Sequence, residues 1–235
     1  MRAHSTVLTA LVVLAMTTQQ AVAQTPDSAS QGDSDLPTVA VMDFTGFMLG
    51  EAGNSVNLGK AVAAMLVTEF ADQPGLKVVE RQRLNSMLTE QKLALSGRVD
   101  ESTAIKIGKM LGVNYMFFGQ VSSIAGQLRM DINVTNVETG QVLQAMKRRD
   151  KTTNLLNVVV SIADDFSKKL DLSPPSDRPP VKPIPIQATI EFSRAVDFED
   201  KGDTAQAVEH YKKVLEIDPD HRGAQAALAR LQKGS

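Results

Sequence analysis

Residues 111–149, LGVNYMFFGQVSSIAGQLRMDINVTNVETGQVLQAMKRR, decide the fold of this chain. Between residues 128 and 135 apolar and polar side chains alternate, as in a strand with one buried and one solvent-facing side. The tripeptide ETG at 138–140 supplies a turn into a second strand that continues to Arg149. Residues 115–121 complete an antiparallel set of three strands.

The segments around this set alternate between strand-like and helical patterns. Short apolar runs at 38–44 and 76–79 predict buried strands. Helices are predicted where apolar residues recur every three or four positions, at 58–70, 84–95, 104–111 and 155–170. We therefore predict an α/β domain over residues 37–172, in which helices cover a mixed, partly antiparallel sheet.

Four segments carry a resemblance to a known family: AMLVTEF (64–70), VVERQRLNSML (78–88), LGVNYMFFGQV (111–121) and LRMDINVTNVETGQVL (128–143). In this order and at this spacing they resemble the periplasmic domain of the CsgG family, the curli secretion channels of Gram-negative outer membranes. The resemblance implies a role in curli-type assembly or secretion, with protein partners and side-by-side oligomerisation. It covers about half of the chain.

The chain departs from these channels in three places. A spanning hairpin needs two strands of about 9–11 residues, whereas only the six residues SSIAGQ separate Val121 from Leu128. A second channel hairpin would follow Arg149, where the helical pattern of 155–170 stands instead. CsgG channels are lipoproteins attached through an N-terminal cysteine, and this chain has no cysteine. We therefore expect a channel-type domain without the channel.

The N-terminal residues predict export. Arg2, the apolar stretch 7–16 and the small residues AVA at 21–23 have the layout of a secretory signal peptide, residues 1–23, cleaved after Ala23. Residues 24–36, QTPDSASQGDSDL, are small, polar and acidic, which predicts a disordered tether. We expect a protein of the outer membrane-bounded periplasmic space, at most peripheral to the outer membrane and without a membrane span after cleavage.

The C-terminal part contains a proline-rich stretch and a helical unit. Six of the ten prolines fall between Pro174 and Pro185, so residues 173–187 predict an extended, semi-rigid linker. Residues 188–235 resemble a tetratricopeptide repeat at Ala195, Phe198, Gly202, Ala207, Tyr211 and Pro219. One repeat is visible, whereas free-standing arrays need about three. We expect this unit to lean on the main domain or on another chain.

Catalytic signatures are missing from the sequence. It has no phosphate-binding glycine loop, no paired metal-ligand spacing and no nucleophile elbow. We expect no enzyme activity, cofactor or metal. Asp43, at the end of the first predicted strand, is interpreted as a structural polar residue, with a catalytic role as the alternative. The net charge of −2 does not provide the excess of positive charge that is typical of proteins that bind nucleic acid.

Two groups of residues are candidate partner contacts. Phe47, Met48 and Leu49 are consecutive apolar residues in a predicted loop, 45–54. They form either a partner-facing cluster or residues that fold back onto the core.

Arg148 and Arg149 belong to a basic patch, residues 147–151, at the end of a predicted strand. Such charges protect an edge strand against unwanted pairing. The alternative is a contact with anionic lipid or cell-wall polymer.

These observations lead to one functional hypothesis. The chain is interpreted as a soluble periplasmic CsgG-like protein that supports an envelope or secretion structure by binding proteins. One alternative is a ring-forming structural component, a homo-oligomer without the channel. The other is a regulator of cell-wall synthesis similar to the Lpo-type activators of penicillin-binding proteins.

Overall fold

The computed structural model describes residues 36–49, 55–90 and 100–233. The predicted signal peptide and all but the last residue of the predicted tether lie outside these residues. The described strands form one sheet: β1 (Thr38–Val41), β2 (Thr45–Leu49), β3 (Ser55–Val56), β4 (Lys77–Val78), β5 (Tyr115–Ile124), β6 (Gln127–Asn136) and β7 (Val142–Lys151). The described α-helices are α1 (Leu58–Ala71), α2 (Arg81–Glu90), α3 (Glu101–Leu111), α4 (Leu155–Lys169), α5 (Ile186–Asp200), α6 (Thr204–Ile217) and α7 (Arg222–Lys233).

Strand β5 organises the sheet. Its first half pairs in parallel with β1 and its second half pairs in parallel with β2, while β6 runs antiparallel along its other side. Strand β7 continues the sheet beyond β6, β4 flanks β1, and β3 flanks β2. Ala125 and Gly126 join β5 to β6 in a two-residue turn, both with positive φ (50° and 74°), which suits the twist of a tight hairpin. The predicted mixed, partly antiparallel α/β sheet is confirmed.

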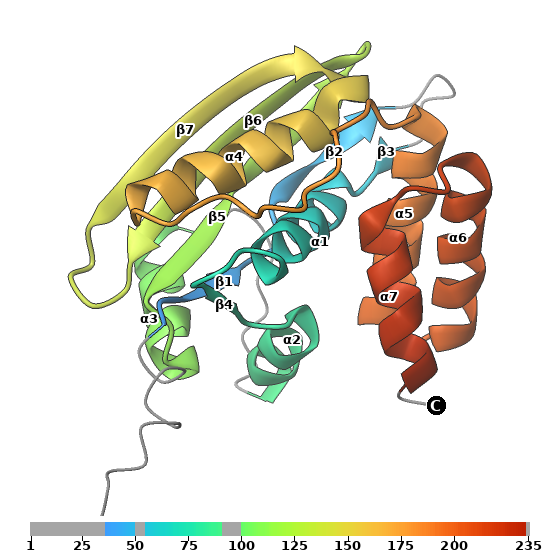
Figure 1. Ribbon diagram of the computed structural model, residues 1–235. Helices are drawn as coiled ribbons and strands as arrows, with labels where there is room; N and C mark the ends of the chain where they lie inside the picture. Colours follow the sequence, from blue (N-terminus) through green and yellow to red (C-terminus); the bar gives the residue numbers. More distant parts are fainter. Residues whose placement is uncertain (1–35, 50–54, 91–99, 234–235) are drawn as a thin grey trace, which may run out of the picture. The chain divides into compact units, whose positions relative to one another are not determined.

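Helices α1 and α4 cover one face of the sheet, which we call the inner face (Figure 1). Phe70 of α1, Phe117 of β5 and Phe166 of α4 meet there, with ring centroids 4.8–5.6 Å apart. Such tilted and edge-to-face aromatic contacts add to the hydrophobic burial of the rings. The helix predicted over 155–170 is thus α4, and its apolar side is the part that meets the sheet.

The opposite, outer face is covered by α2 and α3 at the end where β5 begins. Met42, Met116 and Phe118 are buried there in a second apolar cluster with residues of both helices. Helix α3 begins at Asp100, whose side chain accepts a hydrogen bond of 2.7 Å from the Thr103 amide. It ends at Gly112, the predicted stop, which has a left-handed φ of 69°.

The predicted loop 45–54 is wrong in its first half. Residues Thr45–Leu49 form β2, while residues 50–54 lie outside the described part of the chain. Side chains alternate along this strand: Met48 is buried at 3% exposure, whereas Phe47 and Leu49 are 44% and 47% exposed. The cluster therefore divides between the core and the surface.

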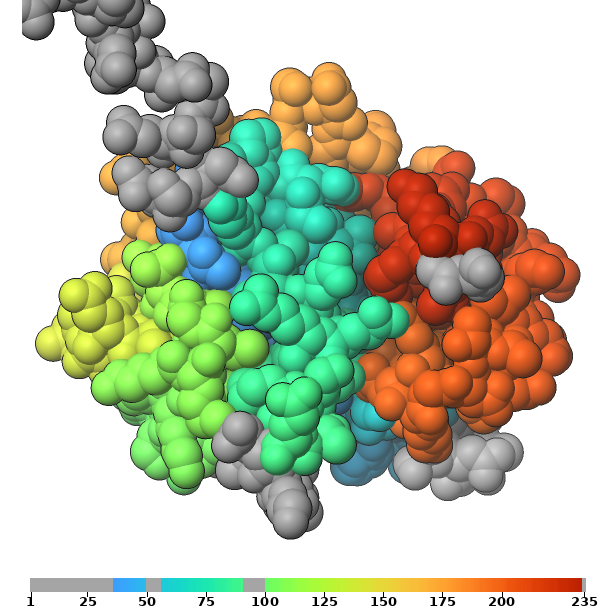
Figure 2. All heavy atoms as spheres, turned by 90° about the horizontal axis from the view of Figure 1, so that it is seen from below, coloured from blue at the N-terminus to red at the C-terminus, as the bar shows by residue number. Residues whose placement is uncertain are grey.

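Helices α5 and α7 pack against α1, and α6 packs against α5 and α7, so the three helices do not stand away from the domain at the end of a spacer. Figure 2 shows these helices, orange to red, directly beside α1 and α2. The proline-rich segment also lies on the domain, because Ile184 is buried at 2% exposure and its amide donates to the Thr153 carbonyl at 2.9 Å. None of the described helices is long and apolar enough to cross a membrane.

Candidate functional site

One row of paired residues crosses four strands of the sheet. Phe47 of β2 lies opposite Ser122 of β5, Ser122 opposite Arg129 of β6, and Arg129 opposite Arg149 of β7. Residues paired across neighbouring strands point to the same side of a sheet. Phe47 and Arg149, which are 102 positions apart in the sequence (149 − 47), therefore point to the same side, the outer face.

The alternation along each strand extends this row into a surface, which we call the open face. It comprises the outer-facing side chains of β2 and of the distal halves of β5, β6 and β7: Phe47, Leu49, Gln120, Ser122, Ile124, Gln127, Arg129, Asp131, Lys147, Arg149 and Lys151. Ile124 is 53% exposed, and the side chains of Lys147, Arg149 and Lys151 are also exposed. No described helix buries this part of the sheet.

Apolar and basic residues lie at opposite sides of the open face. Phe47, Leu49 and Ile124 are at the β2 side, and the cations of β7 are at the other. Arg129 donates from Nε to Asp131 at 2.9 Å within the face. A group of exposed apolar residues with polar and charged side chains around it is typical of a contact surface.

Two of the predicted contact residues point away from the open face. Met48 enters the inner core. Arg148 lies opposite Met130 on the inner side and forms an ion pair with Asp165 of α4. Arg148 therefore binds its own chain, and of the five predicted contacts Phe47, Leu49 and Arg149 lie on the open face.

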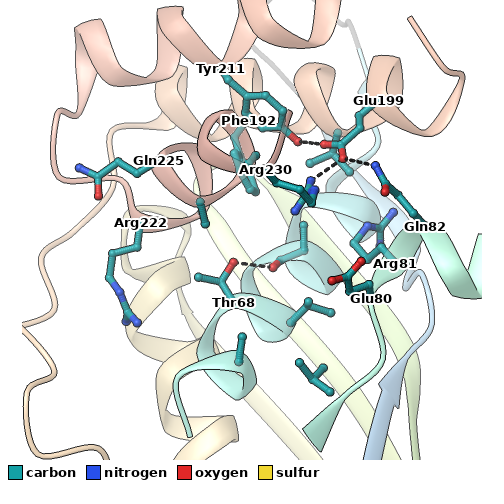
Figure 3. A pocket seen from close by; sticks show the side chains of 18 of the residues that line it. Thr68, Glu80, Arg81, Gln82, Phe192, Glu199, Tyr211, Arg222, Gln225 and Arg230 are labelled. Carbon is teal, nitrogen blue, oxygen red and sulfur yellow. Dashed lines mark hydrogen bonds and ion pairs between the residues drawn. The ribbon is translucent and has the colours of Figure 1, made fainter. Parts of the chain in front are cut away.

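A cavity of about 440 Å³ opens between α1, the start of α2 and the C-terminal helices (Figure 3). Glu199 of α5 lies at its wall and accepts hydrogen bonds from Tyr211 Oη at 2.7 Å and from Gln82 Nε2 at 3.1 Å. Arg230 of α7 forms an ion pair with the same carboxylate. We call this the junction cavity. The polar groups at this wall already bind one another, so they hold the helices together.

Charges on the other side of the junction cavity are also paired. Arg81 donates to Asp43 at 2.5 Å and to Asp200 of α5 at 2.8 Å. Burial by itself lowers the pKa of Arg81, but the two carboxylates outweigh it and raise the pKa. Burial and the neighbouring Glu199 carboxylate raise the pKa of Tyr211, which keeps its hydroxyl as a hydrogen-bond donor.

The comparisons with known proteins concern the α/β part of the chain. Residues 17–129 match the family model described as curli production assembly/transport component CsgG. This chain contains a CsgG-like domain. The match ends at Arg129, inside β6, so β7, α4 and the C-terminal helices lie beyond it. A search of curated proteins found no match.

Solved structures show distant similarity to this CsgG-like domain. The C-terminal domain of LpoB from Salmonella enterica is 17% identical, over 52% of this chain and 87% of that one, with a TM-score of 0.41. Lipoprotein GNA1162 from Neisseria meningitidis is 11% identical, over 56% and 96%, with a TM-score of 0.41. A PelC dodecamer from Paraburkholderia phytofirmans is 12% identical, over 58% and 89%, with a TM-score of 0.35.

Within the CsgG-like domain, Asp43 has a structural partner that the sequence analysis missed. No basic residue lies close to Asp43 in sequence, and Arg81, 38 positions later, forms an ion pair with it. Among the described residues, no group of three or more histidine or acidic side chains could hold a metal ion.

Four residues of the predicted tetratricopeptide signature lie at the contact between α5 and α6: Ala195, Phe198, Ala207 and Tyr211. Ala195 and Ala207 are fully buried, and Phe198 stacks on His210 with ring centroids 5.2 Å apart. Gly202 has a φ of 78° in the turn between the helices, and Pro219 is exposed beyond α6. The match to the CsgG model ends before these residues, so the tetratricopeptide assignment stays a prediction.

Proposed function

We propose that this protein is a binding component of the bacterial cell envelope, which helps to assemble or support an envelope or secretion structure through protein contacts. The observation that carries the proposal is the open face of the CsgG-like domain. Phe47, Leu49 and Arg149, singled out from the sequence as contacts, lie on this one face although β2 and β7 are far apart in sequence. The predicted signal peptide supports a location in the periplasm.

The proposal assigns no catalytic step to the protein. The polar groups described at the junction cavity bind one another, and Asp43 is bound by Arg81. A charged side chain that is held in an ion pair neutralises the opposite charge and holds two helices or strands together. A contact surface, by contrast, needs exposed side chains, and these lie on the open face.

The charges of β7 oppose a ring that is built by pairing of edge strands. This strand has an outer edge without a partner strand in the described sheet, but it carries Lys147, Arg149 and Lys151. Two β7 edges brought together would place like charges side by side, which opposes pairing. Light scattering of residues 24–235 across a concentration series should therefore show a small species, and a large closed ring would favour the structural alternative.

The test uses the full chain with an affinity tag in the organism that encodes it. We expect the protein in the envelope fraction with cross-linked protein partners. A double variant, Phe47→Ser with Leu49→Ser, should keep the location and lose partners, since both side chains are exposed and contribute little to the core. Lys212→Glu, at an exposed position of α6, is the matched control. A protein found outside the envelope fraction would contradict the proposal.

Deletion of the C-terminal helices is a poor test of partner docking. Helix α5 contacts α1 through Lys60, which donates to Asp197 at 2.9 Å, and through Ser193, whose hydroxyl donates to the Asn57 carbonyl. Removing residues 187–235 would expose the apolar side of α1 as well as remove any docking site. Substitutions of exposed residues on α6 separate these two effects.

A further inference from the structure

The open face has the width and the polarity to hold one helix. Neighbouring strands lie about 4.8 Å apart, so β2 and β7 are about 14 Å apart across β5 and β6. An α-helix with its side chains is about 10–12 Å wide. A helix lying on this face would reach Phe47 and Leu49 with one side and the cations of β7 with the neighbouring side.

The outer face of the same sheet already binds helices at its other end. Helices α2 and α3 cover Met42, Met116 and Phe118 there, and these side chains are at most 4% exposed. Further along β5, the outer-facing residue Ile124 is 53% exposed. The helical cover of this face thus stops partway along the sheet, and beyond Gln120 and Ser122 β5 presents one further apolar side chain, that of Ile124, to the same side.

The positive charge of the open face favours an acidic helix. The open face carries four cations, Arg129, Lys147, Arg149 and Lys151, against one carboxylate, Asp131, an excess of three positive charges. The whole chain has a net charge of −2, so this excess is a local feature. A partner with negative charge is favoured here by complementarity and by faster encounter.

We propose that the open face binds an acidic amphipathic helix of a partner protein. The apolar stripe of that helix packs on Phe47, Leu49 and Ile124, and its acidic flank faces β7. This inference rests on the proposed function and deepens it by naming the chemistry of the partner. A membrane surface fits less well, because membrane-binding elements place cations around or above a continuous apolar side, whereas here the apolar group and the cations of β7 lie at opposite sides.

The test uses two synthetic peptides of about 18 residues and the full chain. Both peptides carry leucines at helical spacing; one has glutamates along the flank of this stripe, and the other has lysines there. Fluorescence anisotropy should show binding of the acidic peptide alone. Lys147→Glu combined with Arg149→Glu should weaken it about tenfold, and Phe47→Ser should do so to a similar degree. Lys212→Glu on α6 should leave it unchanged.

Several outcomes would overturn the inference. These are no binding, equal binding of both peptides, or binding that none of the open-face variants weakens. If the protein bound vesicles that contain phosphatidylglycerol and did not bind the peptide, the open face would be a lipid-binding surface. If the protein self-associated and Phe47→Ser abolished this, the occupant of the open face would be a second copy of the chain. The peptide assay uses purified protein, so a negative result would contradict only the proposed helix binding. Absence of the protein from the envelope fraction would contradict only the proposed function.

Discussion

Arg222, the first residue of α7, donates a hydrogen bond of 2.9 Å from Nη1 to Oε1 of Glu69 on α1. Glu69 is only 2% exposed. Its other oxygen, Oε2, lies 3.4 Å from Nε of Arg178 in the proline-rich segment. A buried carboxylate of α1 is therefore bound by cations from the proline-rich segment and from α7, and this contact fixes both to α1.

Arg222→Ala should lower the free energy of unfolding by about 2 kcal/mol, because it leaves Glu69 buried with one cation fewer. Breaking a fully buried pair costs about 3–5 kcal/mol, and we expect less here since Arg178 remains and the Arg222 side chain is 26% exposed. Urea unfolding followed by circular dichroism measures the change. Lys213→Ala, which removes an exposed pair with Glu209, is the control and should leave the midpoint unchanged. Equal effects of the two substitutions would contradict this prediction.

The stability of the protein should fall as the pH drops below about 6.5 because of His221. Burial lowers the pKa of His221, against a smaller opposing effect of Asp218. Below its unfolded pKa of about 6.5 the unfolded chain gains a proton that the folded chain does not, so the free energy of unfolding falls by up to about 1.4 kcal/mol per pH unit until the folded pKa is reached. Above pH 6.5 both states are neutral at this residue, and the penalty is absent.

His221→Asn isolates this effect. The Nδ1 atom of His221 accepts a hydrogen bond of 3.2 Å from the Ala224 amide at the start of α7. Asparagine keeps an acceptor at this position but does not titrate. Urea unfolding at pH 7.5, 6.0 and 5.0 should give a smaller loss in the variant than in the native chain. His210, bound to Glu191, is common to both proteins. Identical losses would mean that His221 does not carry the pH dependence.

Gly59→Ala should prevent the start of α1 from taking its place against the sheet. A Cβ at this position would stand 1.7 Å from the carbonyl oxygen of Phe44, a backbone atom that has no room to rotate away. We expect a loss of about 3 kcal/mol or more, seen in thermal unfolding. In Gly112→Ala nothing lies within 4 Å, so only the positive φ costs about 1–2 kcal/mol. Equal melting temperatures of the two variants would contradict the prediction.

Asp43→Asn tests the proposed absence of catalysis. The Asp43 side chain is 37% exposed and its ion pair with Arg81 is partly solvated, so we expect a loss of stability of at most about 1 kcal/mol. Partner binding in the envelope fraction should be retained. Loss of a cellular phenotype in a variant with native stability and retained partners would indicate that the Asp43 carboxylate has a chemical role.

The hairpins and α4 were predictable because their signals are local. Alternating apolar residues specify β6, whereas the predicted β5 ends at Val121 and the strand continues to Ile124, which leaves only Ala125 and Gly126 for the turn. The apolar spacing of α4 specifies which side meets the sheet.

Strand β2 was not predictable in the same way. It is short and contains Gly46. Its three consecutive apolar residues do not alternate with polar ones, although two of them are exposed, so the sequence lacks the period-two pattern of a strand. Its parallel partner β5 lies about 75 residues later (120 − 45), and only the folded sheet reveals the pairing.

The sequence by itself determined the α/β class, the helix that follows β7 and the resemblance to CsgG, because these depend on the period and spacing of neighbouring residues. The tertiary structure alone decided which candidate contacts share a surface. Phe47 and Arg149 point to the same side of the sheet while Arg148 points to Asp165 on the other side, since side chains alternate along a strand and the register across β5 and β6 fixes the side. It also decided that the C-terminal helices lie on α1 and α2, because their ion pairs join residues more than 100 positions apart, such as Arg81 with Asp200 and Glu69 with Arg222.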